Sequence, residues 1–246
     1  MPERFAAARS DGFDAVEILV TEGVTVDVLA DSAAGAGIGV AMCNVSMGDF
    51  PGGGVGLSGV PTKQAEFRKA VVDARTMAEK LACRKIHIGP SRVPAGIDHQ
   101  ACMDCLAENL YFAANCFAAS GIETLIEPLN NIDTPDICLS RVSDAIALMD
   151  ETALPNVCLQ FDVYHAAQME ANYIDLLSRY IQRVGHIQFA DVPGRGEPGS
   201  GNIDFEALFA RIDALGYSGW VGAEYQPSKP ASETLTWLQS ESASAH

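Results

Sequence analysis

The sequence predicts an α/β fold of the (β/α)8-barrel class that lacks the first strand of the barrel. Short apolar runs bounded by turn residues alternate along the chain with longer segments that carry apolar residues at helical spacing. In the second half, four consecutive apolar runs each carry or end in a side chain that can bind a metal ion. Because ligands collect at the carboxyl ends of parallel strands, this repetition indicates a site at one end of a barrel.

The first half of the chain is expected to alternate four helices with three strands. The opening helix has Pro2 near its start and is stopped by Gly12. The third helix carries Phe67, Val71 and Met77 at helical spacing. The predicted order is helix 2–11, strand 13–20, helix 25–34, strand 38–45, helix 62–82, strand 84–91 and helix 98–119.

A glycine-rich segment, MGDFPGGGVGLSGVP, lies between the second predicted strand and the third helix. Gly-Lys-Ser/Thr does not follow it, which argues against a phosphate-binding P-loop. Long loops in compact domains are usually functional or disordered. The two remaining interpretations are a flexible surface loop and a lid over the strand ends, and we favour the lid.

The second half contains the four site-bearing strands, which lie in LIEPLNN, CLQFDVYH, HIQFAD and WVGAEYQP. Helices are expected near 139–152, 170–182 and 204–215, with Asp204 as an N-cap and Gly216 as a stop, and a closing helix near 231–240. The prediction is one barrel domain over 1–240 with a disordered tail at 241–246. Since the series begins with a helix, the strand that opens such a barrel is missing, and the strands beside the gap would have unpaired edges.

Composition excludes several classes of function. The 246 residues are 48% apolar, enough for a large core, and 32 acidic against 16 basic residues give a net charge of −16. This charge argues against nucleic acid and against an anionic membrane surface as partners. No apolar run reaches the length of a membrane helix, and the N-terminus lacks the apolar core of a secretory signal. The seven cysteines, including the pair Cys102 and Cys105, are expected to be buried thiols in a reducing cytoplasm.

The candidate metal ligands are Glu127, Asp162, Gln188 and Glu224, one from each of the four strands. Three carboxylates and an amide oxygen select a hard cation, and Mg²⁺ or Mn²⁺ suits a near-octahedral site with two positions left for substrate. An ion chelated by a carbonyl and a neighbouring hydroxyl would acidify the intervening C–H and stabilise an enediolate. The expected reaction is a ketose–aldose type isomerisation, with Glu127 and Glu224 as acid and base on opposite sides of the substrate.

Side chains alternate along a strand, so the layer below the four ligands is predicted to contain Leu125, Gln160, His186 and Gly222. Gln160 and His186 are unusual in a barrel interior. We expect them to hydrogen-bond to each other or to the ligands above, orienting Gln188 and Asp162. For His186 the alternative is a buried histidine without a role at the site.

Four further residues are candidates for substrate contacts. His165 follows Asp162 by three residues and can bind a substrate hydroxyl or carbonyl, or lie in a surface loop. Arg195, in PGRGEPGSG, can grip a carboxylate in bidentate fashion, with Glu197 holding it in place. His87, on the third predicted strand, is a weaker candidate for the pocket floor.

These motifs point to a family. IEPLNN, LQFDVYH, GHIQFADVPGRGEP and GAEYQP, with ERFAAARSDGFDAVE and GGGVGLSGVP earlier in the chain, closely resemble the hydroxypyruvate isomerase family of xylose isomerase-like barrels. The resemblance implies metal-assisted conversion of hydroxypyruvate to tartronate semialdehyde. It also implies the four ligands named above, Glu127 and Glu224 as the acid/base pair, and substrate contacts by His165 and Arg195. Family members often self-associate, so a homo-oligomer is a further expectation.

Two alternatives remain beside this interpretation, and a third, a nuclease, is set aside. A close relative of the family acts on 2-oxo-tetronate, and the sequence does not separate the two substrates. A shortened, inactive barrel that serves as a binding module is the non-enzymatic alternative. A barrel nuclease for abasic DNA sites would need a histidine-rich zinc site and a basic groove, whereas this chain has five histidines and a large acidic excess.

Overall fold

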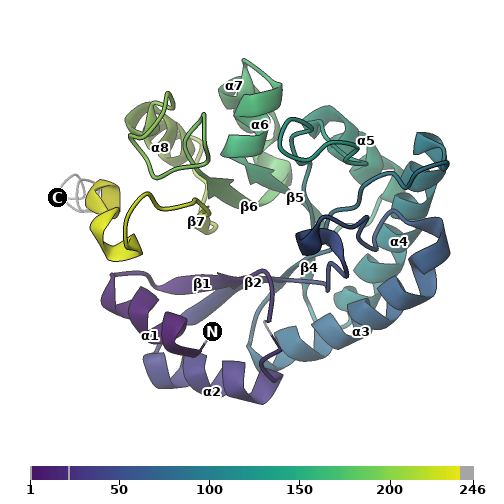
Figure 1. Ribbon diagram of the computed structural model, residues 1–246, viewed down its shortest axis with the longest axis horizontal. Coiled ribbons are helices and arrows are strands. Elements are labelled where there is room, and N and C mark those ends of the chain that lie inside the picture. Colours follow the sequence, from purple (N-terminus) through teal and green to yellow (C-terminus); the bar gives the residue numbers. More distant parts are fainter. Residues whose placement is uncertain (1, 22, 239–246) are drawn as a thin grey trace.

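A single sheet of seven parallel strands, in the sequential order β1 to β7, forms the centre of the molecule (Figure 1). The computed structural model describes residues 2–21 and 23–238. Figure 1 shows the strands around the centre and the helices outside them. The predicted barrel of seven strands is confirmed, with β1 and β7 as the two edges of the sheet. The strands are β1 Ala15–Ile18, β2 Gly39–Asn44, β3 Lys85–His87, β4 Glu123–Ile126, β5 Val157–Asp162, β6 Val184–Phe189 and β7 Val221–Ala223.

Helices follow the strands much as predicted. The α-helices of the described residues are α1 Pro2–Ser10, α2 Val26–Ala36, α3 Gln64–Lys80, α4 His99–Ala118, α5 Val142–Thr152, α6 Val163–Met169, α7 Tyr173–Tyr180 and α8 Phe205–Ala214. Short 3₁₀ turns lie at Phe50–Gly52, Pro61–Lys63, Ile181–Arg183 and Ala231–Glu233. The predicted signals at α8 are confirmed, since Oδ1 of Asp204 accepts from the Ala207 N–H at 3.0 Å and Gly216 has φ +68°.

Two helix predictions were inaccurate. In place of one helix at 170–182, the chain enters α6 directly after β5 and then forms α7. The reason is that the carboxylate of Asp162 accepts from the Tyr164 N–H at 2.8 Å and so caps a helix at the strand end. The closing helix at 231–240 begins as a 3₁₀ turn, and residues 236–238 are helical. Its last two residues and the tail predicted at 241–246 lie outside the described residues.

The core lies between the sheet and the surrounding helices. Phe67 and Val71 of α3 and Phe117 of α4 are fully buried, which confirms the predicted apolar faces. Inside the barrel, Gln160 and His186 are also buried, as predicted for the layer below the strand ends. Cys102 and Cys105 are buried free thiols. Among the described residues, no helix is both long enough and apolar enough to cross a membrane.

The glycine-rich loop between β2 and α3 is fixed to the body of the protein. Leu57 and Ser58 are buried, and Oγ of Ser58 donates to the Gly89 carbonyl at 2.8 Å. The Gly59 N–H donates to Oγ of Ser91 at 2.8 Å. These contacts join the loop to the segment after β3. The interpretation of this segment as a lid over the strand ends stays a prediction.

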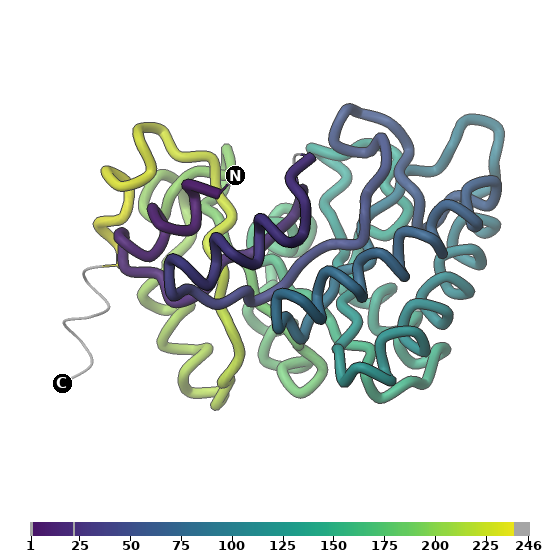
Figure 2. Tube along the Cα trace, turned by 90° about the horizontal axis from the view of Figure 1, so that it is seen from below, coloured from purple at the N-terminus to yellow at the C-terminus, as the bar shows by residue number. Residues whose placement is uncertain are grey.

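The two ends of the described chain meet beside the gap between β1 and β7. Figure 2 shows α1, in purple, next to the yellow C-terminal segment. The rings of Phe13 and Trp237 have centroids 6.5 Å apart, and Trp237 also packs edge-on against Phe189 of β6 at 5.2 Å. Aromatic packing thus covers part of the gap that an additional strand would fill in a closed barrel.

Candidate active site

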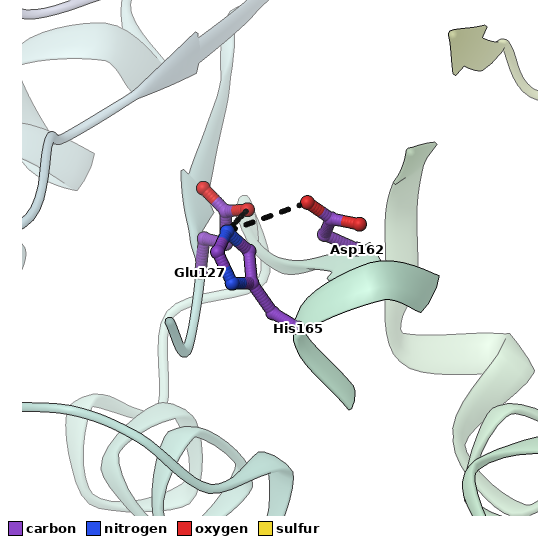
Figure 3. Close-up of side chains that lie close together, drawn as sticks. All are labelled: Glu127, Asp162 and His165. Carbon is purple, nitrogen blue, oxygen red and sulfur yellow. Dashed lines mark ion pairs between the residues drawn. The ribbon is translucent and has the colours of Figure 1, made fainter. Parts of the chain in front are cut away.

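Three side chains converge at the carboxyl ends of β4 and β5 (Figure 3). Glu127 follows β4, Asp162 ends β5, and His165 lies in the first turns of α6. One potential ligand atom from each lies within 4.8 Å of the others. Nε2 of His165 is 3.5 Å from Asp162 Oδ2 and 4.0 Å from Glu127 Oε1. All three residues are buried, and Oε1 of Glu127 has no hydrogen-bond partner. The proximity of Glu127 and Asp162 agrees with the sequence prediction.

The electrostatics of this cluster favour a bound positive charge. Burial raises the pKa of the Glu127 carboxyl well above its usual range, and the nearby Asp162 and Glu224 raise it further. For Glu224, desolvation outweighs the opposing effect of Arg195, and its pKa is raised to about 8. A divalent cation would stabilise the ionised form of each carboxylate. The buried, unpartnered oxygen of Glu127 and the excess of acidic groups therefore fit a hard metal ion.

Arg195 reaches the same cluster from the loop after β6. Its Nη2 is 3.0 Å from Glu224 Oε2, directly after β7, and 3.5 Å from Asp162 Oδ2. The guanidinium also lies over the ring of Tyr164, 5.3 Å from its centroid. The side chain of Arg195 is 27% exposed, so part of it is accessible to a ligand.

The predicted role of Glu197 as the partner of Arg195 was wrong. Its carboxylate accepts hydrogen bonds from the N–H and the hydroxyl of Ser228, with 3.1 Å to the nitrogen. The Gln226 N–H donates to the Arg195 carbonyl at 2.7 Å. Glu197 thus joins the loop to the segment after β7, while Asp162 and Glu224 hold the guanidinium.

Asp191 holds this loop from inside, a role that the sequence analysis missed. It is fully buried, and its carboxylate accepts from the N–H groups of Val192, Gly199, Gly201 and Ile203 at 2.7 to 3.0 Å. A carboxylate is well suited to satisfy four converging backbone donors. The only signal in the sequence was an acidic residue at the end of an apolar run and before a glycine-rich loop.

Gln188 lies one strand along from Asp162, with the two residues in register between β5 and β6. Its Oε1 accepts from Gln160 Nε2 at 2.5 Å, and its Nε2 donates to Glu17 Oε2 at 2.7 Å. The prediction that Gln160 supports a ligand residue agrees with this contact. The prediction for His186 was wrong, because His186 bonds to neither Gln160 nor a ligand but to Glu17 of β1, at 2.6 Å.

The hydrogen bonds of His165 define which of its nitrogens carries the proton. Nδ1 faces two donors of Asn130, the backbone N–H at 3.2 Å and the side-chain amide at 2.7 Å. Nδ1 is therefore an acceptor, and burial lowers the pKa of His165, so the ring is neutral with its proton on Nε2. That N–H faces the carboxylate cluster. His165 accordingly suits a hydrogen-bond donor to a substrate better than a metal ligand.

His87 lies beside Glu127 at the end of β3, where the sequence analysis placed the pocket floor. Its Nε2 is 3.9 Å from Glu127 Oε2. Desolvation, with a smaller contribution from His186, lowers the pKa of His87 to about 3, so this histidine is neutral.

The parallel sheet with helices outside it places the protein in the α/β-barrel class, and its strand ends carry three residues that could hold a metal ion. The chain belongs to the xylose isomerase-like TIM barrel family, whose model matches residues 5–241. It is 39% identical to a 2-oxo-tetronate isomerase of Cupriavidus necator, over 96% of this chain and 91% of that protein. It is 34% identical to the hydroxypyruvate isomerase of Escherichia coli, again over 96% and 91%. A putative hydroxypyruvate isomerase of Homo sapiens is 39% identical, over 98% and 89%.

Solved structures show the same fold. A crystal structure from Brucella melitensis, described as an AP endonuclease of family 2, superposes with a TM-score of 0.92 at 33% identity, covering 97% of this chain and 92% of that one. A 3-keto-D-glucoside 4-epimerase from Escherichia coli superposes with a TM-score of 0.80 at 22% identity, covering 97% and 94%. The second likeness concerns the fold alone.

Proposed function

We propose that this protein is a metal-assisted isomerase that interconverts hydroxypyruvate and tartronate semialdehyde. The observation that carries the proposal is the acidic cluster at the strand ends, where Glu127 lies near Asp162 and His165, and Arg195 pairs with both Asp162 and Glu224. Relatives named hydroxypyruvate isomerase, similar over nearly the whole chain, support it. A reducing, cytoplasmic location is part of the proposal, since all seven cysteines are free.

The proposed metal ligands are Glu127, Asp162, Gln188 and Glu224, and the proposed ion is Mg²⁺ or Mn²⁺. All four offer oxygen, the donor atom that these ions prefer. When bound, the ion would withdraw electron density from a substrate carbonyl and its neighbouring hydroxyl and so acidify the C–H between them.

The protein's own groups would carry the protons. Conversion of hydroxypyruvate breaks a C–H bond at C3 and forms one at C2, while a hydroxyl proton passes from the C3 oxygen to the C2 oxygen. One of Glu127 and Glu224 would remove the carbon-bound proton and the other would deliver a proton from the opposite side. Without a metal ion, burial raises the pKa of Glu224 to about 8, and a bound ion would favour the ionised form that acts as a base. The N–H of His165 would donate to a substrate oxygen, and Arg195 would bind the substrate carboxylate.

An assay of the purified protein tests this function directly. Hydroxypyruvate and 2-oxo-tetronate are offered separately with Mg²⁺, Mn²⁺, Ca²⁺ or Zn²⁺, and after treatment with a chelator. We expect turnover of hydroxypyruvate that the chelator abolishes and that Mg²⁺ or Mn²⁺ restores. A higher kcat/KM for 2-oxo-tetronate would reassign the substrate, in agreement with the similarity to the Cupriavidus necator enzyme. Absence of turnover with both acids and every ion would reject the isomerase and favour the binding module.

Cleavage of abasic DNA is not proposed, despite the description of the Brucella melitensis structure. In the part of the chain that the structure describes, one cluster of three potential ligands from His, Cys, Asp or Glu was found, and it contains a single histidine. A net charge of −16 opposes the approach of a phosphate backbone.

The raised pKa values predict a pH-dependent effect of metal on stability. In metal-free protein, the Glu224 carboxyl stays protonated between about pH 4.5, where it ionises in the unfolded chain, and about pH 8. Over this range the folded state holds more protons than the unfolded state, so the free energy of unfolding falls as pH rises. Saturating Mn²⁺ should offset this loss and raise Tm more at pH 8 than at pH 5.

Differential scanning fluorimetry across pH, with and without Mn²⁺, measures this effect. The matched control is Glu206→Gln, an exposed residue of α8, which should keep the pH dependence of the wild-type protein. An increase in Tm by Mn²⁺ that is equal at pH 5 and pH 8 would contradict a role of the raised-pKa carboxyls in binding the ion.

A further inference from the structure

A side chain from β1 reaches across the open side of the barrel to β6. The carboxylate of Glu17 accepts from His186 Nε2 through Oε1 at 2.6 Å and from Gln188 Nε2 through Oε2 at 2.7 Å. The two edge strands, β1 and β7, are not hydrogen-bonded to each other in the described sheet. Glu17 therefore connects the first strand to the sixth, and its side chain is only 14% exposed.

Gly222 of β7 leaves the space in which this carboxylate lies. A Cβ atom added at Gly222 would overlap Oε1 of Glu17 and would lie 2.8 Å from its Cδ. The space that a barrel strand normally fills with its own inward-facing side chain is thus occupied by a carboxylate from β1. The position of Glu17 on β1 therefore depends on a glycine at position 222 of β7.

The amide of Gln188 receives its orientation from this contact. A carboxylate accepts hydrogen bonds and does not donate them, so it holds the nitrogen of the amide and repels the oxygen. The oxygen, Oε1, then faces Gln160 Nε2 and uses one of its two lone pairs there. An amide rotated by 180° would face the Glu17 carboxylate with its oxygen and Gln160 Nε2 with its own nitrogen, so both hydrogen bonds would be lost.

We infer that Glu17 is a positioning residue for the metal site, which fixes Gln188 so that its oxygen is available as a ligand. Gly222 contributes to the same arrangement, because its lack of a side chain leaves the space for the Glu17 carboxylate. The inference rests on one part of the proposed function, the binding of a divalent ion at this site, and does not depend on the isomerase reaction. Orientation of a ligand by a neighbouring hydrogen bond typically changes metal affinity 10–100-fold.

The test compares Mn²⁺ binding by the full-length protein in four forms: wild type, Glu17→Gln, Gly222→Ala, and the double variant. Isothermal titration calorimetry measures Kd for Mn²⁺. Thermal unfolding and circular dichroism show whether each variant is folded. Glu17→Gln replaces an acceptor by an amide that can hold Gln188 in either orientation, so we expect Kd for Mn²⁺ to rise about 10–100-fold. Gly222→Ala should have a similar effect, and the double variant should be no worse than the stronger single variant, because one contact is lost in each case.

The control is Asp14→Asn, an exposed residue just before β1 that pairs with Arg9, and it should bind Mn²⁺ like the wild type. If Glu17→Gln lowers Tm but leaves Kd unchanged, Glu17 only closes the barrel and the inference is wrong. Wild-type protein that binds Mn²⁺ but isomerises neither acid would reject the proposed function and leave the Kd comparison valid. Wild-type protein that binds no Mn²⁺ would overturn both.

Discussion

Replacing Glu224 with glutamine is expected to lower kcat for hydroxypyruvate by about 10³-fold while the protein stays folded. The substitution keeps the shape of the side chain and removes the group that can exchange a proton. It also removes a carboxyl whose pKa is raised by burial, so the metal-free variant should be no less stable than the wild type near pH 8. Steady-state kinetics with Mn²⁺ and a thermal melt on the same preparation measure both effects.

Glu224 is proposed both as a ligand and as a proton carrier, so the metal concentration must be varied. A loss of kcat that persists at saturating Mn²⁺ would report proton transfer, whereas a loss that high Mn²⁺ restores would report ligation alone. Glu127→Gln is expected to show the same persistent loss, and Glu206→Gln serves as the neutral control on α8. Retention of more than a tenth of wild-type kcat in Glu224→Gln would show that the acid/base pair is assigned incorrectly.

The candidate site could be predicted where local sequence and topology determine position. In a parallel sheet whose spatial order follows the chain, residues at successive strand ends must lie at one end of the barrel. Glu127 and Asp162 therefore lie together, and Gln188 pairs in register with Asp162. Arg195 lies at the same end of the barrel, near Asp162 and Glu224, because it follows β6 by a few residues.

The rest depended on contacts between distant segments. Glu17 bonds to His186 and Gln188 across 169 and 171 residues, and the space for its carboxylate depends on a glycine at position 222. The start of α6 was missed because Asp162 caps a helix while ending a strand. The role of Asp191 depends on how a later loop folds back on it. Periodicity and turn residues do not encode such long-range pairs. The sequence therefore predicted helices and strands more accurately than the hydrogen-bond partners of individual side chains.

Asp191→Asn is expected to lower kcat/KM for hydroxypyruvate by about 10²-fold and to reduce stability by roughly 3 kcal/mol. An asparagine has one acceptor oxygen and an amide nitrogen, so about half of the four backbone donors would lose their acceptor. These donors hold both ends of the loop that carries Arg195, which itself has φ +55°. Released from Asp191, the loop would no longer hold the Arg195 guanidinium against Asp162 and Glu224.

Urea unfolding and steady-state kinetics separate the two consequences of Asp191→Asn. Asp213→Asn, on the exposed face of α8, is the matched control and should change neither. A second variant, Gly201→Ala, disturbs the same loop without altering a charge, because an added Cβ would lie 2.6 Å from Asp191 Oδ1. If both loop variants lose stability but keep the kcat/KM of the wild type, Arg195 does not need this loop conformation to bind the acid. If both variants lose kcat/KM for the acid substrate, the buried Asp191 positions Arg195 for binding the substrate carboxylate.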